Sequence, residues 1–149
     1  MKLELRPGEK LNALVVDDED DIRETLVTFL QMMGIFTFVI EAKDGGDAYR
    51  KCQIQKFDLI ITDLMMPIVK GIDFIRNYKA HEVREKMTEN PAPIIILSAN
   101  VTSAEVTKAV KFGVKYVITK PCTAEQFIAK VTDVMIKHKR DKIKVIKEG

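Results

Sequence analysis

The chain has 149 residues, of which 46% are hydrophobic, and this is enough to bury one core of ordinary domain size. Its two cysteines form no CxxC pair, which argues against a disulfide framework or a zinc site. No apolar run approaches the length of a membrane span, and the first ten residues are too charged for a signal peptide. These features predict a cytoplasmic protein without a membrane partner.

The formal net charge of +2 is unevenly distributed along the chain. Residues 137–149 contain six basic and two acidic residues, a net charge of +4, which leaves −2 for the remainder. A nearly neutral body argues against a nucleic-acid partner, because nucleic-acid surfaces cluster Lys and Arg. We interpret residues 139–149 as a basic tail that is a frayed helix end or a solvated linker. Contact with nucleic acid or an anionic membrane, or a link to a further domain, stays open as an alternative.

Five short apolar runs lack the alternation of a half-exposed sheet and therefore predict buried parallel strands. They are residues 13–16, 37–40, 59–61, 94–97 and 116–118. Apolar residues at helical spacing follow each of these runs. They predict helices over residues 22–33, 47–55, from 71 through 78, from about 103 to 113 and over 123–134. The fivefold alternation of strand and helix predicts one α/β domain, with a parallel sheet between two layers of helices.

Two segments do not fit this alternation. Leu3 and Leu5 alternate with charged residues before Pro7, too briefly to predict a strand, so we expect residues 1–10 to form an N-terminal arm. Residues 79–93 are long and highly charged for a connection between a helix and a strand. We expect them either to extend the third helix or to form a surface excursion.

Polar side chains follow four of the five predicted strands, where functional groups gather in open α/β sheets. The acidic run 17–21 follows the first strand, Asp63 the third, Ser98 and Ala99 the fourth, and Lys120 the fifth. Carboxylates gathered at an apolar edge repel one another unless a cation compensates, and oxygen ligands select a hard ion such as Mg²⁺. Asp63 is then free to attack phosphorus, while Lys120 pairs with the transferred group.

These residues, in this order at these strand ends, resemble the receiver domain of two-component response regulators. The resemblance covers residues 11–138 and implies a flavodoxin-like, doubly wound sheet of five parallel strands in the order 2-1-3-4-5, with five helices. It implies a phosphorylation-activated switch of the stand-alone, chemotaxis-regulator type, which catalyses only its own phosphoryl transfer and autodephosphorylation. A sensor histidine kinase or a phosphotransfer protein would donate the phosphoryl group. A downstream protein partner would read the altered surface of helix four, strand five and helix five.

The resemblance also implies a role for each matching residue, and every position of the pattern holds a suitable residue type. These roles are phosphoacceptor for Asp63, Mg²⁺ ligands for Asp17, Asp18, Asp63 and the backbone carbonyl of Met65, phosphate-binding or switch residues for Ser98, Ala99, Lys120 and the aromatic Tyr116, and structural residues for Pro121, after a cis peptide, and Gly71. The departure from the family pattern is the stretch 79–93, which lengthens the interval between Asp63 and Ser98.

Two other functions fit parts of the same pattern. A Mg²⁺-dependent phosphohydrolase would also use Asp63 as its nucleophile, but a dehalogenase-type phosphatase places a second acid two residues later, where this chain has Met65. A flavodoxin-like FMN binder would need hydroxyls and backbone donors after the first strand, where this chain is acidic. The oligomeric state stays open between a monomer and a phosphorylation-dependent dimer.

Overall fold

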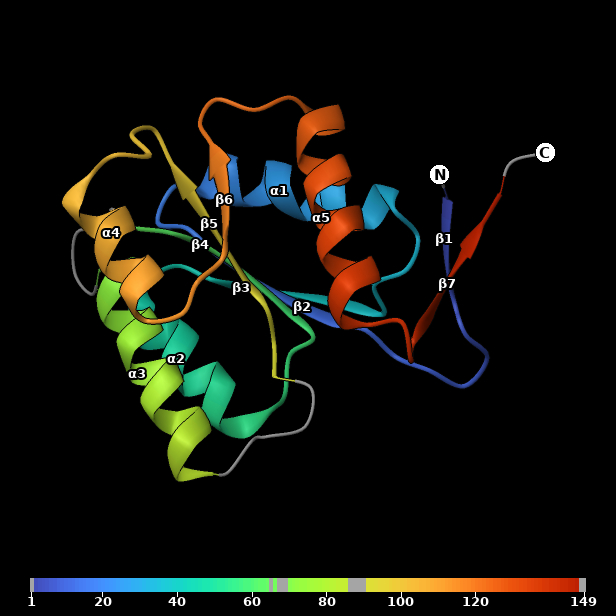
Figure 1. Cartoon of the computed structure of the whole chain (residues 1–149), viewed down its shortest axis with the longest axis horizontal. Coiled ribbons are helices and arrows are strands. Elements are labelled where there is room, and N and C mark those ends of the chain that lie inside the picture. Colours follow the sequence, from blue (N-terminus) through green and yellow to red (C-terminus); the bar gives the residue numbers. More distant parts are fainter. Residues whose placement is uncertain (1, 65, 67–69, 86–90, 148–149) are drawn as a thin grey trace.

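The computed structural model describes residues 2–64, 66, 70–85 and 91–147. A sheet of five parallel strands forms the centre of the molecule, in the order β3-β2-β4-β5-β6 (Figure 1). Its strands are β2 (Asn12–Val16), β3 (Phe38–Ala42), β4 (Leu59–Asp63), β5 (Ile94–Ser98) and β6 (Tyr116–Thr119). Counted within this sheet alone, the order is 2-1-3-4-5. The predicted flavodoxin-like fold is therefore confirmed.

Five helices cover the two faces of the sheet. They are α1 (Asp20–Met32), α2 (Gly45–Ile54), α3 (Gly71–Arg84), α4 (Ala104–Lys111) and α5 (Ala124–His138). The helices α1 and α5 contact each other on one face, whereas α2, α3 and α4 form the other layer (Figure 1). Neighbouring residues of one strand belong to different hydrophobic clusters, so Ile60 faces the α2–α4 layer and Ile61 faces the α1–α5 layer. Burial on both faces explains why the inner strands β2, β4 and β5 read as continuous apolar runs. The edge strands β3 and β6 are partly exposed.

Local sequence signals set several of the helix ends. Thr123 and Gln126 form a reciprocal capping box at the start of α5, in which each side chain accepts a hydrogen bond from the other residue's backbone N–H. Gly34 follows α1 with a φ of 68°, a left-handed conformation that favours glycine. Helix α3 continues to Arg84, so the first part of the charged stretch 79–93 extends this helix, as one of the two expectations had it. Residues 86–90 lie outside the described part of the chain.

A second, two-stranded sheet joins the two ends of the chain. Strand β1 (Lys2–Leu5) pairs antiparallel with β7 (Ile143–Ile146), beside the C-terminal end of α5 (Figure 1). Leu3 and Ile143 are buried in the hydrophobic cluster shared with α1 and α5. The interpretation of the tail as frayed or solvated is therefore wrong for residues 143–146, and the arm contains a strand. Each strand has only four residues, and its partner lies at the opposite end of the chain, so neither segment reveals the pairing by itself.

Asp58 connects the segment before β7 to the central sheet by a hydrogen bond and two ion pairs. Its Oδ2 accepts a hydrogen bond from the backbone N–H of Asn12, at 2.9 Å, and its Oδ1 lies 2.9 Å from Lys142 Nζ and 3.5 Å from Lys139 Nζ. Lys139 is 1% exposed, and burial lowers its pKa while the Asp58 carboxylate acts in the opposite direction. Removing one partner of a buried ion pair strongly lowers the stability of the folded protein, because the other charge stays buried without compensation.

Replacing Asp58 with Asn should therefore lower the free energy of unfolding by about 3 kcal/mol, because it removes the carboxylate that faces two lysines. A matched control is Glu4→Gln in β1, whose carboxylate pairs with Lys144 at 3.6 Å while both side chains are about half exposed. The control should change stability by less than about 1 kcal/mol. Denaturant unfolding measures both changes, and equal effects of the two substitutions would contradict a fastening role for Asp58.

Candidate functional site

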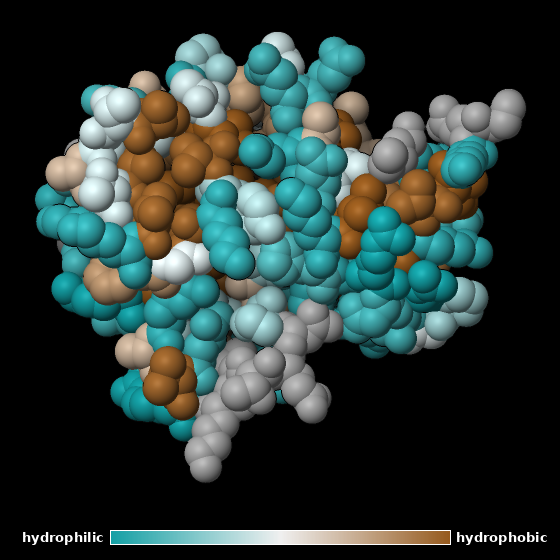
Figure 2. Space-filling view, viewed as in Figure 1, coloured by the Kyte–Doolittle hydropathy of each residue, from teal (hydrophilic) through white to brown (hydrophobic). Residues whose placement is uncertain are grey.

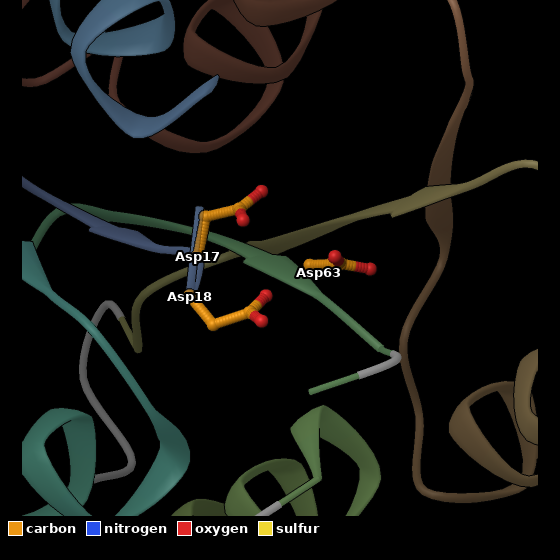
Figure 3. A group of neighbouring side chains, drawn as sticks. All are labelled: Asp17, Asp18 and Asp63. Atoms are coloured by element: carbon orange, nitrogen blue, oxygen red, sulfur yellow. The ribbon is translucent and has the colours of Figure 1, made fainter. Parts of the chain in front are cut away.

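Three aspartates meet at the carboxyl edge of the central sheet. Asp17 and Asp18 directly follow β2, and Asp63 is the last residue of β4, the neighbouring strand. One carboxylate oxygen from each residue lies within 4.8 Å of the other two. Figure 3 shows the Asp17 and Asp18 side chains extending from the end of β2 on the side where Asp63 lies. The predicted acidic site is thus brought together by adjacent parallel strands.

Asp17 is the most deeply buried member of this cluster, with 0% of its surface exposed. Its Oδ1 accepts a hydrogen bond from the backbone N–H of Glu19, at 2.9 Å. Its Oδ2 is buried and accepts no hydrogen bond from any residue that the structure describes. Burial raises the pKa of the Asp17 carboxyl, and the nearby Asp63 and Asp18 carboxylates act in the same direction. A buried carboxylate oxygen without a hydrogen bond, next to two further carboxylates, is a donor set that suits a hard cation.

Lys120 provides a positive charge next to the cluster. It follows β6, and its Nζ lies 3.0 Å from Asp63 Oδ2 and 3.9 Å from Asp17 Oδ2. The Lys120–Pro121 peptide bond is cis, as the sequence resemblance implied. The lysine therefore pairs directly with Asp63.

Ser98 and Ala99 lie at the end of β5, next to the end of β6, where Ser98 is in register with Thr119. The Ser98 hydroxyl donates to the backbone carbonyl of Asn100, at 2.9 Å, and accepts from the backbone N–H of Asn100, at 3.1 Å. Ala99 is exposed and lines a pocket of 510 Å³ that Lys120 also lines. In this conformation the serine hydroxyl is engaged with its own loop.

Gly71 begins α3 against the end of β4. Its backbone N–H donates to the carbonyl of Leu64, at 3.1 Å. A β-carbon at this position would lie 2.0 Å from the backbone oxygen of Asp63, a distance that no side chain tolerates. A side chain here would displace the backbone that carries Asp63, so the structural importance predicted for Gly71 has a steric reason.

Tyr116 does not lie at this site. It begins β6 opposite Ile95, three residues before the end of β5 at Ser98, and its ring packs against the cluster of α1 and α5. Its hydroxyl lies 2.6 Å from Nε2 of His138, at the end of α5. The residue of β6 that faces the α4 layer is Val117. The prediction of Tyr116 as the switch aromatic is therefore wrong, because successive residues of a strand point to opposite faces.

Met65, the predicted source of a backbone carbonyl, lies outside the described residues. Arg23 on α1 is a contact of the site that the sequence analysis missed. Its guanidinium donates to the backbone carbonyl of Asp17, at 2.8 Å, and to the carboxylates of Asp20 and Glu41. The spacing of Asp20 and Arg23 on one helix offered a partial signal. The contacts with Asp17 and Glu41 depend on the tertiary fold.

None of the helices in the described part of the chain is long and apolar enough to cross a membrane. The chain matches the family model of the response regulator receiver domain over residues 13–132. It is 30% identical over 136 residues to chemotaxis protein CheY-3 of Vibrio cholerae, an alignment that covers 91% of this chain and 93% of that protein.

Two solved structures show the same similarity in three dimensions. A chain in the CheX–CheY–BeF3–Mg²⁺ complex from Borrelia burgdorferi is 25% identical, with a TM-score of 0.73 over 86% of this chain and 91% of that one. A chain in the complex of the Saccharomyces cerevisiae phosphotransfer protein Ypd1 with the receiver domain of Ssk1 is 25% identical, with a TM-score of 0.76 over 89% of this chain and 94% of that one. The chain belongs to the receiver domain family of response regulators, the signalling proteins of two-component and phosphorelay systems that are phosphorylated on aspartate by a histidine kinase or a phosphotransfer protein.

Proposed function

We propose that Asp63 is the residue that accepts the phosphoryl group, and that the resulting aspartyl phosphate changes the surface that a partner protein binds. The observation that carries this proposal is the position of the Asp63 carboxylate, 3.0 Å from Lys120 Nζ and within 4.8 Å of the Asp17 and Asp18 carboxylates. Its side chain is 11% exposed, so one face stays open to a donor. Asp18 is exposed, and Asp17 is buried.

An oxygen of the Asp63 carboxylate attacks the phosphorus of a phosphohistidine, or of a small acyl phosphate. With phosphohistidine, the bond from phosphorus to the ring nitrogen breaks, and the ring keeps the electron pair and takes up a proton from water. With an acyl phosphate, the bond from phosphorus to the bridging oxygen breaks, and a carboxylate leaves with the electron pair. In both cases an acyl phosphate forms on Asp63. Mg²⁺ held by Asp17, Asp18, Asp63 and the Met65 carbonyl would offset the negative charge that gathers on the phosphoryl oxygens. Lys120, already paired with Asp63, transfers its charge–charge contact to the phosphoryl group.

Ser98 then exchanges its hydrogen bonds with Asn100 for one with a phosphoryl oxygen. This exchange draws the loop between β5 and α4 toward Asp63 and stabilises one of two existing conformations. Val117, the β6 residue on the α4 side, is the neighbour whose packing this movement changes. Tyr116 keeps its contact with His138 on the opposite face.

The surface that reports the change is formed by α4, β6 and α5, which correspond to helix four, strand five and helix five of the predicted fold. Val101, Val110 and Phe112 are 48%, 56% and 37% exposed at or beside α4. Figure 2 shows hydrophobic residues gathered over the part of the surface where α4 and β6 lie. An exposed apolar area of this kind supports a protein partner.

The phosphoryl donor is a sensor histidine kinase or a phosphotransfer protein in the cytoplasm. The similarity to the Ssk1 receiver domain, solved with the phosphotransfer protein Ypd1, supports this donor class. An apolar pocket between α1 and the loop after β6 reaches Lys120 and gives a donor protein a surface beside the acceptor. The chain acts on no substrate other than its own aspartyl phosphate, and residues 11–138 carry the activity.

Replacing Asp63 with Asn should abolish labelling by radioactive acetyl phosphate, because the amide is not a nucleophile toward phosphorus. Wild-type protein should be labelled with Mg²⁺ and not with EDTA. Asp73→Asn, which changes a carboxylate in the first turn of α3 whose side chain is 40% exposed, should be labelled like wild type. Labelling of the Asp63 variant would refute the acceptor assignment. Sustained release of phosphate from added phosphoesters would favour a phosphohydrolase instead.

Replacing Asp17 with Asn should stabilise the Mg²⁺-free protein by about 0.5–2 kcal/mol, because it removes a buried charge that the fold disfavours. Since the pKa of Asp17 is raised, protonation relieves the same penalty. The gain is therefore largest near neutral pH, and it shrinks as the pH falls through the raised pKa. Adding Mg²⁺ should stabilise wild type and leave the variant nearly unchanged.

Thermal unfolding with EDTA and with Mg²⁺ measures these differences, and Asp73→Asn again serves as the control, because its carboxylate is only partly buried. A less stable Asp17 variant in EDTA would contradict the explanation that this carboxylate is kept for the metal at the expense of stability.

A further inference from the structure

The backbone of Asp17 is held by two hydrogen bonds, one on each side of its α-carbon. The backbone N–H of Asp17 donates to the carbonyl of Ala42 in β3, at 3.1 Å. Its backbone carbonyl, which belongs to the same peptide group as the N–H of Asp18, accepts from Arg23 Nη1 at 2.8 Å. The orientation of this peptide group determines how the two acidic side chains stand relative to each other.

The Arg23 guanidinium is itself fixed by two further contacts. Nε lies 3.0 Å from Glu41 Oε1 at the end of β3, and Nη2 lies 2.6 Å from Asp20 Oδ1 in the first turn of α1. The Arg23 side chain is 14% exposed, although its two carboxylate partners are much more exposed. A planar guanidinium can donate in three directions at once, which an ammonium on a flexible stem cannot do with the same geometry. Arg23 therefore connects the end of β2, the start of α1 and the end of β3.

We propose that Arg23 is a positioning residue for the metal site, acting through the Asp17–Asp18 peptide group. This inference rests on the proposed Mg²⁺ site and adds a specific residue to it. Mg²⁺ requires a nearly octahedral arrangement of ligands at about 2.0–2.1 Å, whereas Ca²⁺ accepts longer and more variable distances. Loosening the peptide group should weaken Mg²⁺ binding more than Ca²⁺ binding.

The positive charge of Arg23 should weaken cation binding, whereas its hydrogen bonds should strengthen it. The two roles can therefore be separated. If Arg23 mattered only as a positive charge, its removal would leave Asp20 and Glu41 uncompensated and would strengthen cation binding. If it positions the acids, its removal weakens Mg²⁺ binding although the site becomes more negative. Arg23→Lys keeps the charge and loses the three directed hydrogen bonds, so a role in positioning predicts weaker binding for this variant too.

The experiment titrates Mg²⁺ alone into the whole chain and follows the backbone amide NMR signals of Asp18 and Asp63. We expect the Mg²⁺ dissociation constant to rise about tenfold in Arg23→Met, in line with losses of other residues that orient metal ligands, and severalfold in Arg23→Lys. A parallel titration with Ca²⁺ should show a smaller rise. The control is Arg50→Met on α2, where a 71% exposed arginine pairs with Asp47, and its Mg²⁺ affinity should match that of wild type.

Unchanged Mg²⁺ affinity in Arg23→Lys, or tighter binding in Arg23→Met, would overturn the positioning role. An equal rise of the Mg²⁺ and Ca²⁺ dissociation constants would also overturn it, because a general loss of structure would affect both ions alike. Arg23→Lys decides the question if Arg23→Met does not fold. A wild-type protein that shows no saturable Mg²⁺ binding would instead refute the proposed metal site.

Discussion

The arrangement of the whole site depends on placing three carboxylates at one apolar edge of the sheet. Asp17 is fully buried, one of its oxygens accepts no hydrogen bond from the described residues, and its pKa is raised by burial. Lys120 offsets part of the negative charge through its contacts with Asp63 and Asp17. A chain optimised only for stability would not keep this cluster, because repulsion and desolvation both oppose it. In the proposed function, a hard cation held by these carboxylates would offset this cost.

The parallel sheet brings these groups together and also determines which side chains can respond. Neighbouring strands end at the same edge, which places Asp17, Asp63 and Ser98 close together although they are distant in the sequence. Alternation along β6 sends Tyr116 toward His138 and α5, and Val117 toward α4. A conformational change at Ser98 that reached the α4 surface through β6 would therefore involve the aliphatic Val117. The aromatic ring stabilises the opposite face.

Much of the fold could be predicted from the sequence because its main signals are local. The buried strands are continuous apolar runs, the helices have clear amphipathic patterns, and the acidic residues and Lys120 stand directly at strand ends. The β1–β7 sheet could not be predicted, because each short strand pairs only with the other, and the two are brought together only by the folded chain. The assignment of Tyr116 failed by one position, since an aromatic residue near Lys120 does not reveal which face of β6 it occupies. The Arg23 contacts join three separate elements and are visible only in three dimensions.

The most direct test is a crystal structure of the chain with Mg²⁺ and beryllofluoride, which mimics a phosphoryl group on a carboxylate. We expect the beryllium to be bonded to an Asp63 carboxylate oxygen, with Lys120 Nζ and the Ser98 hydroxyl within hydrogen-bond distance of its fluorides. The metal should contact Asp17, Asp18 or both. Beryllofluoride on another carboxylate, or a Ser98 hydroxyl still bonded to Asn100 beside a bound adduct, would contradict the proposed switch.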